Sequence, residues 1–378
     1  MRRLLAFVTL LLAALTAACA SAPERAATPA PSPGLRRVGV ICDALALCPF
    51  ESAPLYPPEL LARVATEDPA RAEVLARSED AWAASSELVA TLRGLLTEGG
   101  GRALVRVDDL ADARWSPSTL AAVADGLVLW APRGALSERA YATLRDYVAR
   151  GGRLVVALGP WELFVPEVPY MTERLIASPT NIGPWLADLG VPVQEALVVD
   201  EVEHGEWTET AGLPPLARSS ELLPVAHGLV DAPETPFSAT PRVVMPLATV
   251  LATSRAVPDR DFVARCVARG ASTARLGAPA SPRSPMFAEM CLAALVTHPS
   301  GGGVLVVGSD LGLPPVTDGA IAGPARSDEP RTTAAADRVA RAVAEAYYAF
   351  FDRLTVTRDT LRANLPLIRA LFDWSAGR

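Results

Sequence analysis

The chain has no lysine and only three histidines, so arginine carries all of its permanent positive charge. Its 35 basic residues are outnumbered by 42 acidic ones, which gives a net charge of −7. Such a chain gains nothing electrostatically from nucleic acid or from an anionic lipid surface. We therefore expect no nucleic-acid partner, and we attribute the exclusive use of arginine to a bias toward GC-rich codons.

Long apolar runs are also absent beyond the N-terminus, because no stretch after Cys19 reaches the roughly 18 residues of a membrane span. The chain begins with two arginines and a short apolar run from Leu4 to Ala18, which is typical of a secretory signal. Thr16-Ala17-Ala18-Cys19 resembles a bacterial lipobox. We expect residues 1–19 to form a lipoprotein-type signal peptide with lipidation at Cys19. The expected location is the cell envelope, on the periplasmic face of the outer membrane.

Residues 20–36 are rich in alanine, proline and serine and have no apolar period. This composition predicts a semi-extended tether between the lipid anchor and the folded domain. The alternative for the N-terminus is ordinary cleavage near Ala20 or Ala22 without a lipid.

Four further cysteines follow, and an even number in an exported chain favours disulfides. Of the three possible pairings we favour Cys42–Cys48 and Cys266–Cys291, since each joins the cysteines nearest in sequence. Buried free thiols are the alternative. A Cys-x5-Cys spacing is not by itself a metal signature.

The stretch from Asp125 to Gly159 predicts a strand, a helix and a second strand. Residues 126–130 and 154–158 are short apolar runs, as expected of strands buried on both faces. Between them, apolar residues recur at helical spacing, Ser137 can cap the helix, and Gly151-Gly152 can end it. Parallel strands joined by a crossover helix form a right-handed βαβ unit.

The rest of the chain gives weaker signals, and residues 161–179, 214–241 and 255–285 show no clear period. The expected strands cover residues 37–42, 103–107, 191–202, 242–252, 286–297 and 303–308. The expected helices cover residues 59–77, 81–97, 116–124, 180–189, 333–354 and the last residues from Asn364. Alternating strands and helices indicate an α/β fold with a three-layer, mainly parallel sheet in residues 37–378, with a loop- and strand-rich insertion at about 161–302.

The βαβ stretch resembles the auxiliary, extracytoplasmic subunits of gliding-motility-type ABC transport systems. The resemblance rests on Pro132, Leu136-Ser137 and Gly151-Gly152 between the strands, and on later pieces at Asn181-Ile182, Trp185-Leu186, Leu189–Val191, His227–Leu229, Val304–Asp310, Asn364 and Asp373-Trp374. It implies a flavodoxin or class I glutamine amidotransferase type of fold. It also implies a permease and ATPase complex, or another envelope component, as partner.

Amidotransferases carry a nucleophilic cysteine on a sharp strand-to-helix turn. Here the strand ending at Leu158 leads into Gly159-Pro160-Trp161-Glu162, which contains no cysteine. Ser309 follows another apolar strand and could be a nucleophile with His227 or His298, but it lacks the Gly-x-Ser-x-Gly frame. We favour the interpretation that Ser309 and Asp310 bind loop backbone.

Open α/β sheets bind ligands at the carboxyl ends of their strands. Trp130 and Trp161 end neighbouring strands there, so they could bind a small ligand or a glycan, or only cover the end of the sheet. The residues that could contact a ligand at this edge are Trp130, Arg133, Gly159, Trp161, Glu162, Ser309 and Asp310.

The most metal-like cluster is Asp200 to Glu206, which contains His204. Alternation along a strand would send Glu201 and Glu203 to one face and His204 to the other, so we expect an acidic hairpin and no metal. No cofactor is expected. The sequence thus favours a non-catalytic, lipid-anchored binding or scaffold protein of an ABC-type transport system. A cell-envelope hydrolase and a glycan-binding module remain the alternatives.

Overall fold

The computed structural model describes residues 35–43, 46, 48–50, 58–67, 69, 72, 93–98, 101–132, 134–159, 161–164, 174–177, 181–205, 222–240, 242–253, 261–277, 290–311 and 364–377. The chain divides into two units, residues 1–35 and residues 36–378, and the fold is that of the second unit. The predicted signal peptide, Cys19 and residues 20–34 of the predicted tether lie outside the described residues, and Arg36, the last residue assigned to the tether, is instead the first residue of β1.

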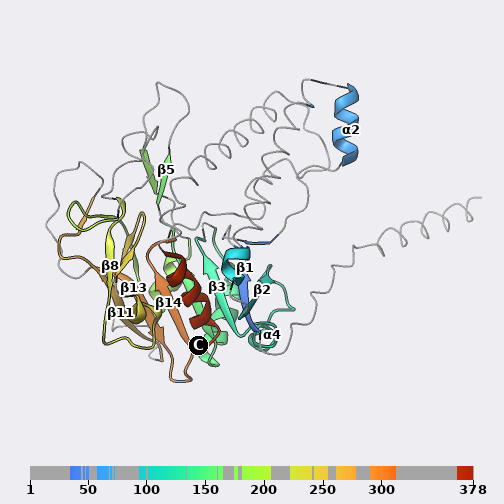
Figure 1. Ribbon diagram of the computed structural model, residues 1–378. Coiled ribbons are helices and arrows are strands. Elements are labelled where there is room, and N and C mark those ends of the chain that lie inside the picture. The colour runs from blue at the N-terminus through green and yellow to red at the C-terminus, as the bar shows by residue number, and fades with distance from the viewer. Residues whose placement is uncertain are drawn as a thin grey trace, which may run out of the picture. The chain divides into compact units, whose positions relative to one another are not determined.

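Five parallel strands form one half of a large sheet, in the spatial order β2-β1-β3-β4-β14 (Figure 1). The two central runs predicted from the sequence are the neighbouring parallel strands β3 and β4, as expected. The bounds are Arg36–Ile41 for β1, Arg102–Val107 for β2, Gly126–Trp130 for β3, Arg153–Ala157 for β4 and Gly303–Val307 for β14.

Alternate residues of these strands enter two different hydrophobic cores. Val128 and Val155 belong to one core, and Leu127 and Leu154 to the other. Helix α5 (Glu138–Ala149) packs on β4 and β14 and adds its apolar side to the second core. The helix over residues 364–375, red in Figure 1, adds Leu367, Ile368, Leu371 and Phe372 to the first core.

The ends of α5 follow the predicted signals. The Ser137 hydroxyl accepts the Ala140 N–H at 3.2 Å, and Gly151 adopts a φ of 96° after the helix. Gly152 lies against the ring of Tyr147, where a Cβ atom would come within 2.3 Å of that ring. The short helix α4 (Pro117–Val123) is likewise capped by Ser116.

Antiparallel strands make up the other half, so the sheet is mixed and the expectation of a mainly parallel sheet holds for the first half alone. Strand β13 joins the halves by pairing with β14 around the predicted turn at 298–302. Figure 1 shows β8, β11 and β13 beside β14. The bounds are Val193–Val199 for β7, Val225–Gly228 for β8, Arg242–Val244 for β9, Thr249–Leu251 for β10, Val263–Gly270 for β11, Arg275–Leu276 for β12 and Cys291–Thr297 for β13.

Several stretches without a predicted strand do form strands. The hairpin of β5 (Trp161–Phe164) and β6 (Arg174–Ala177) is a separate two-stranded sheet, and β8 and β11 lie in regions expected to be irregular. The single strand predicted over 242–252 is wrong, because a turn at Pro246-Leu247 divides it into β9 and β10.

The remaining described helices are α2 (Pro58–Glu67), α6 (Gly183–Asp188) and α7 (Pro236–Ala239), and residues 93–97, at the end of the helix predicted over 81–97, are also helical. The helix predicted over 333–354 lies outside the described residues. Among the described helices, none is long and apolar enough to cross a bilayer.

Two disulfides join Cys42 to Cys48 and Cys266 to Cys291, which confirms the expected pairing. The first closes the loop after β1, and the second ties β11 to β13. Disulfides persist in oxidising compartments outside the cytosol, in agreement with an exported protein.

Candidate functional site

The carboxyl ends of the parallel strands are the first place to look for a ligand. From β1 the chain moves to β2 on one side and then to β3 on the other, so the order reverses between β1 and β3. Open α/β sheets bind ligands in the crevice at such a reversal. The β5–β6 hairpin follows directly from β4 at this edge (Figure 1).

Backbone strain collects at the same edge. Among the described residues, the non-glycine positions with positive φ are Asp109, Ala131, Leu247 and Leu311, with values from 47° to 57°. Asp109 follows β2, Ala131 follows β3 and Leu311 follows β14, while Leu247 precedes β10 beside the end of β14. Each such conformation costs on the order of 1 kcal/mol and persists only where neighbouring contacts enforce it.

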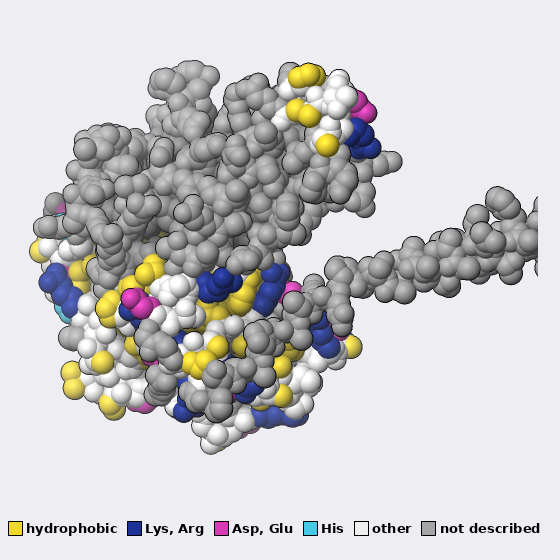
Figure 2. Space-filling model, turned by 45° about the vertical axis from the view of Figure 1, so that its right-hand side comes forward, with side chains coloured by type: hydrophobic (Ala, Val, Ile, Leu, Met, Phe, Trp, Pro, Cys, Tyr) yellow, Lys and Arg dark blue, Asp and Glu magenta, His cyan; other side chains and the backbone are white. Residues whose placement is uncertain are grey.

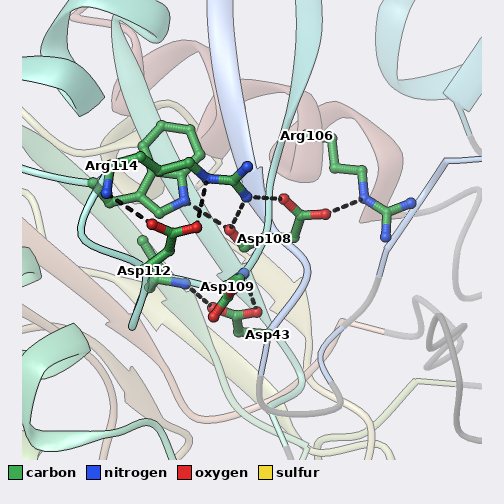
Figure 3. A network of polar contacts seen from close by, with 8 residues as sticks. Asp43, Arg106, Asp108, Asp109, Asp112 and Arg114 are labelled. Atoms are coloured by element: carbon green, nitrogen blue, oxygen red, sulfur yellow. Dashed lines mark hydrogen bonds and ion pairs between the residues drawn. The ribbon is translucent and has the colours of Figure 1, made fainter. Parts of the chain in front are cut away.

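Asp43 supplies one of those contacts. Its carboxylate accepts the backbone N–H groups of Asp109 and Leu110 at 2.7 and 2.6 Å (Figure 3). Charge-assisted bonds of this kind are among the stronger hydrogen bonds in proteins. Asp43 therefore locks the loop after β1 to the loop after β2 and holds Asp109 in its strained conformation.

The side chains next to Asp43 form a network that holds the loop after β2. Asp108 accepts from Arg106 at 3.2 Å and from Arg114 at 3.0 Å, and its carbonyl accepts the indole N–H of Trp115 at 2.7 Å (Figure 3). Arg114 also lies 5.3 Å from the Trp115 ring centroid. Because these groups already bind one another, the network explains the loop and leaves no evident ligand position.

Ser309 is fully buried and engaged on both sides. Its hydroxyl donates to the Pro246 carbonyl at 2.7 Å and accepts the Leu311 N–H at 3.1 Å. These bonds fix the strained residue Leu311 and join the end of β14 to the turn before β10. The structure thus places Ser309 in the role of binding loop backbone.

Neither proposed histidine lies beside Ser309. His298 sits in the turn before β14 and contacts Ser300, so the length of β14 separates it from Ser309 by roughly 20 Å. His227 lies on β8, three inter-strand spacings from β14, or about 14 Å. The pair of Ser309 with His227 or His298 that was considered for an envelope hydrolase is therefore not assembled.

Trp130 is 0% exposed and belongs to the core. Its indole N–H donates to the Asp310 carbonyl at 3.0 Å, and its ring packs on Phe372 at a centroid distance of 5.9 Å. A ring buried in this way covers the end of the sheet and leaves no face on which a sugar could stack.

Gly159 and Asp310 meet as the edge-site prediction requires. A Cβ atom at Gly159 would lie 3.5 Å from Asp310 Oδ2 and 3.3 Å from the Ala131 Cβ. Buried Asn364 also reaches this edge, where its amide donates to the carbonyls of Val244 at 2.7 Å and Leu311 at 3.2 Å. The start of the C-terminal helix is thereby fixed against the end of β14.

The remaining predicted edge residues are less defined. Trp161 is half-buried and packs on the cluster of Leu197, Val199 and Leu222. Glu162 occupies β5 opposite Ile176. Arg133 lies outside the described residues.

The metal-like cluster separates into structural contacts. Buried Asp200 accepts the N–H groups of Val202 and Glu203 and the hydroxyl of Thr273, while Glu201 pairs with Arg275. In the part of the chain that the structure describes, no group of three or more His, Cys, Asp or Glu side chains could hold a metal ion.

Sequence reasoning missed Asp43 and the role of Asp200. Asp200 directly follows β7 and Asp43 lies two residues after the end of β1, and this position after a strand was the available signal. Their partners are backbone groups from distant segments, and no sequence pattern marks such partners.

On the face shown in Figure 2, the arginine side chains of the described residues do not form one basic field. Figure 2 shows them at several separate places on one face, among hydrophobic and uncharged groups. Mixed charge of this kind provides little long-range steering of an anionic ligand.

No family model matches the chain, and no curated protein matches it. One similar solved structure is described as the mmIFT52 N-terminal domain, with 17% identity, coverage of 60% of this chain and 78% of that one, and a TM-score of 0.38. We draw no conclusion about fold or function from a likeness at this level.

Proposed function

We propose that this chain is a non-catalytic, lipid-anchored binding or scaffold protein of the bacterial envelope. In this proposal Cys19 carries the lipid, the protein faces the periplasm from the outer membrane, and it serves as an auxiliary component of an ABC-type transport system. For the parallel half we propose the three-layer flavodoxin or glutamine amidotransferase type of arrangement. The packing of α5 and of the C-terminal helix into different cores supports that arrangement.

The observation that carries the non-catalytic part is the state of Ser309. A nucleophilic serine needs an exposed oxygen and a base within hydrogen-bond reach. The Ser309 hydroxyl is instead buried and donates its proton to the Pro246 carbonyl. Binding through surfaces, with the edge residues used to hold loops together, accounts for these contacts.

The transporter assignment rests on the sequence resemblance, and affinity capture tests it. The full-length chain with a C-terminal tag would be expressed in its source cells, and the envelope dissolved in mild detergent. We expect an ATPase and a permease to co-purify, and a tagged envelope lipoprotein of unrelated sequence to capture neither. If neither co-purifies with this chain under conditions that keep it folded, the transporter assignment is wrong.

Lipidation and catalysis have separate tests. Cys19→Ser should abolish the mass added by acylation and release the protein from the membrane fraction. Ser309→Ala should leave the results of an esterase and amidase panel unchanged. Hydrolysis by the wild type that this variant loses would overturn the non-catalytic assignment.

A further inference from the structure

Three basic positions line up across the antiparallel half of the sheet. His227 on β8 lies directly opposite Arg242 on β9 and directly opposite Arg269 on β11. The two arginines flank His227 and bring permanent positive charge to this row. This basic row is therefore a position where a negative group is favourable.

Glu203 supplies such a group from the turn after β7. Its Oε1 lies 2.8 Å from His227 Nε2 and 3.8 Å from Arg242 Nε. The backbone of Glu203 is fixed, because its carbonyl accepts the Val225 N–H and its N–H donates to Asp200. The backbone that carries this carboxylate is thus held next to the row by bonds that do not depend on the charge of the carboxylate.

The contact with Glu203 does not occupy the hydrogen-bond donors of the Arg242 guanidinium group. A separation of 3.8 Å is too long for a hydrogen bond, and the Arg242 side chain is 62% exposed, against 43% for His227 and 35% for Glu203. A guanidinium group offers five donors in a planar fork that can hold a carboxylate with two bonds. Arg242 therefore has the geometry to bind a second carboxylate that arrives from solvent.

We propose that Arg242 and His227 form a carboxylate-recognition surface on which an acidic segment of a partner protein docks. The incoming carboxylate binds the Arg242 fork and competes with Glu203 for His227. The proposal rests on the proposed function in one respect, namely that the chain acts through surface contacts.

The test is fluorescence anisotropy of a labelled oligoglutamate peptide at low ionic strength with the mature full-length chain, and oligoglutamine of equal length as the neutral probe. Arg242→Gln should weaken oligoglutamate binding about fivefold, and Glu203→Gln, which weakens the competitor, should strengthen it about threefold. The matched controls are Arg265→Gln and Glu234→Gln, which make the same charge changes in a neighbouring ion pair. We expect each control to change binding by less than half as much.

Equal effects of the Arg242 and Arg265 substitutions would show attraction by overall charge and would overturn the proposal. So would unchanged binding in Glu203→Gln. Far-UV circular dichroism of each variant shows whether a loss of peptide binding is caused by unfolding. If a variant unfolds, oligoglutamate binding by His227→Gln is the second test of the surface. If the peptide results hold while no ATPase or permease co-purifies, the carboxylate surface stands and the transporter assignment falls. If an ATPase and a permease co-purify but the peptide results fail, only the proposed carboxylate-recognition surface is wrong.

Discussion

The two halves of the sheet bury their strands in different ways. All five residues of β3 and all five of β14 are buried, and helices add to the cores on their alternate faces. In the antiparallel half, four of the eight residues of β11 are buried, one is exposed and three are partly buried, and the strand shifts register twice against β13. Burial on both faces supports the middle of the sheet, where it also includes six of the seven residues of β13, whereas β11 at the outer side is less completely buried and is tied to β13 by a disulfide.

Their polar groups differ in the same way. At the carboxyl edge of the parallel half, Asp43, Ser309 and Asn364 bind backbone groups and hold loops in place. At the outer side of the antiparallel half, Glu203 and Arg242 remain accessible and only loosely paired. This contrast is why we assign the framework to the parallel half and partner recognition to the antiparallel half.

The largest expected effect is the loss of a core aromatic from the parallel half. Trp130→Ala removes a fully buried ring and its bond to Asp310, and should lower the free energy of unfolding by about 3–5 kcal/mol. Because β14 of the parallel half pairs with β13 of the antiparallel half, we expect both halves to lose hydrogen-exchange protection together. Phe237→Ala, beside β8 at the outer side, is the matched control and should expose β8 and β9 before the rest. Identical exchange patterns for the two variants would contradict a difference between the halves.

The two disulfides offer a second contrast. Cys266 and Cys291 are 25 residues apart and Cys42 and Cys48 are 6 apart. The loop-closure relation predicts that replacing Cys266 and Cys291 by serine lowers the free energy of unfolding by about 3.5 kcal/mol. Replacing Cys42 and Cys48 by serine should lower it by about 2 kcal/mol. Chemical denaturation of the two double variants measures both. A larger loss from the Cys42–Cys48 pair would mean that native contacts of the loop after β1 outweigh chain entropy.

How much the sequence predicted also differs between the halves. Continuous apolar runs such as Leu127–Trp130 have one explanation, a strand buried on both faces, and they were located correctly. In β11, register shifts at Cys266 and Ala268 interrupt the period of two, so Val263–Gly270 did not read as a strand. Pro246 and the left-handed Leu247 divide β9 from β10 through a bond to Ser309, which no local pattern encodes.

At the candidate site, the sequence located the edge but not the state of its residues. Trp130, Gly159 and Asp310 lie together at this edge. Whether Trp130 faces solvent or the core depends on Phe372, which is contributed by a helix far along the chain. Long-range packing of this kind decides exposure, and hydrophobic periodicity reports it only for neighbours in sequence.

Ser309→Ala gives an intermediate effect at the boundary between the halves. The substitution leaves the Pro246 carbonyl and the Leu311 N–H without their buried partner, which should cost about 1–3 kcal/mol. Thermal denaturation measures the loss, and Ser300→Ala in the exposed turn before β14 is the control, with an expected change below about 0.5 kcal/mol. A variant as stable as the wild type would show that Ser309 is not needed to join β14 to the turn before β10.

The smallest effect at neutral pH comes from Tyr147 of α5, which tests the burial of the parallel half. Burial raises the pKa of Tyr147 from 10.0 to about 12, the charge of Asp125 adds to the increase, and a backbone hydrogen bond from Arg153 opposes it. The folded state thus keeps a proton that the unfolded state loses above pH 10. This contribution is fully present below pH 10 and disappears as the pH rises toward 12, and it amounts to at most about 2.7 kcal/mol.

Denaturation of the wild type and of Tyr147→Phe between pH 8 and pH 12 therefore separates the hydroxyl from the ring. The variant should lose less stability over this range, by about 2 kcal/mol, because it has no phenol to ionise. Tyr141→Phe is the matched control on the same helix. Burial also raises the pKa of Tyr141, but its side chain is half-buried, so we expect the smaller change there. Equal alkaline sensitivity of Tyr147→Phe and the wild type would mean that water reaches this face of the parallel half, and the contrast between the halves would then lose its main physical basis.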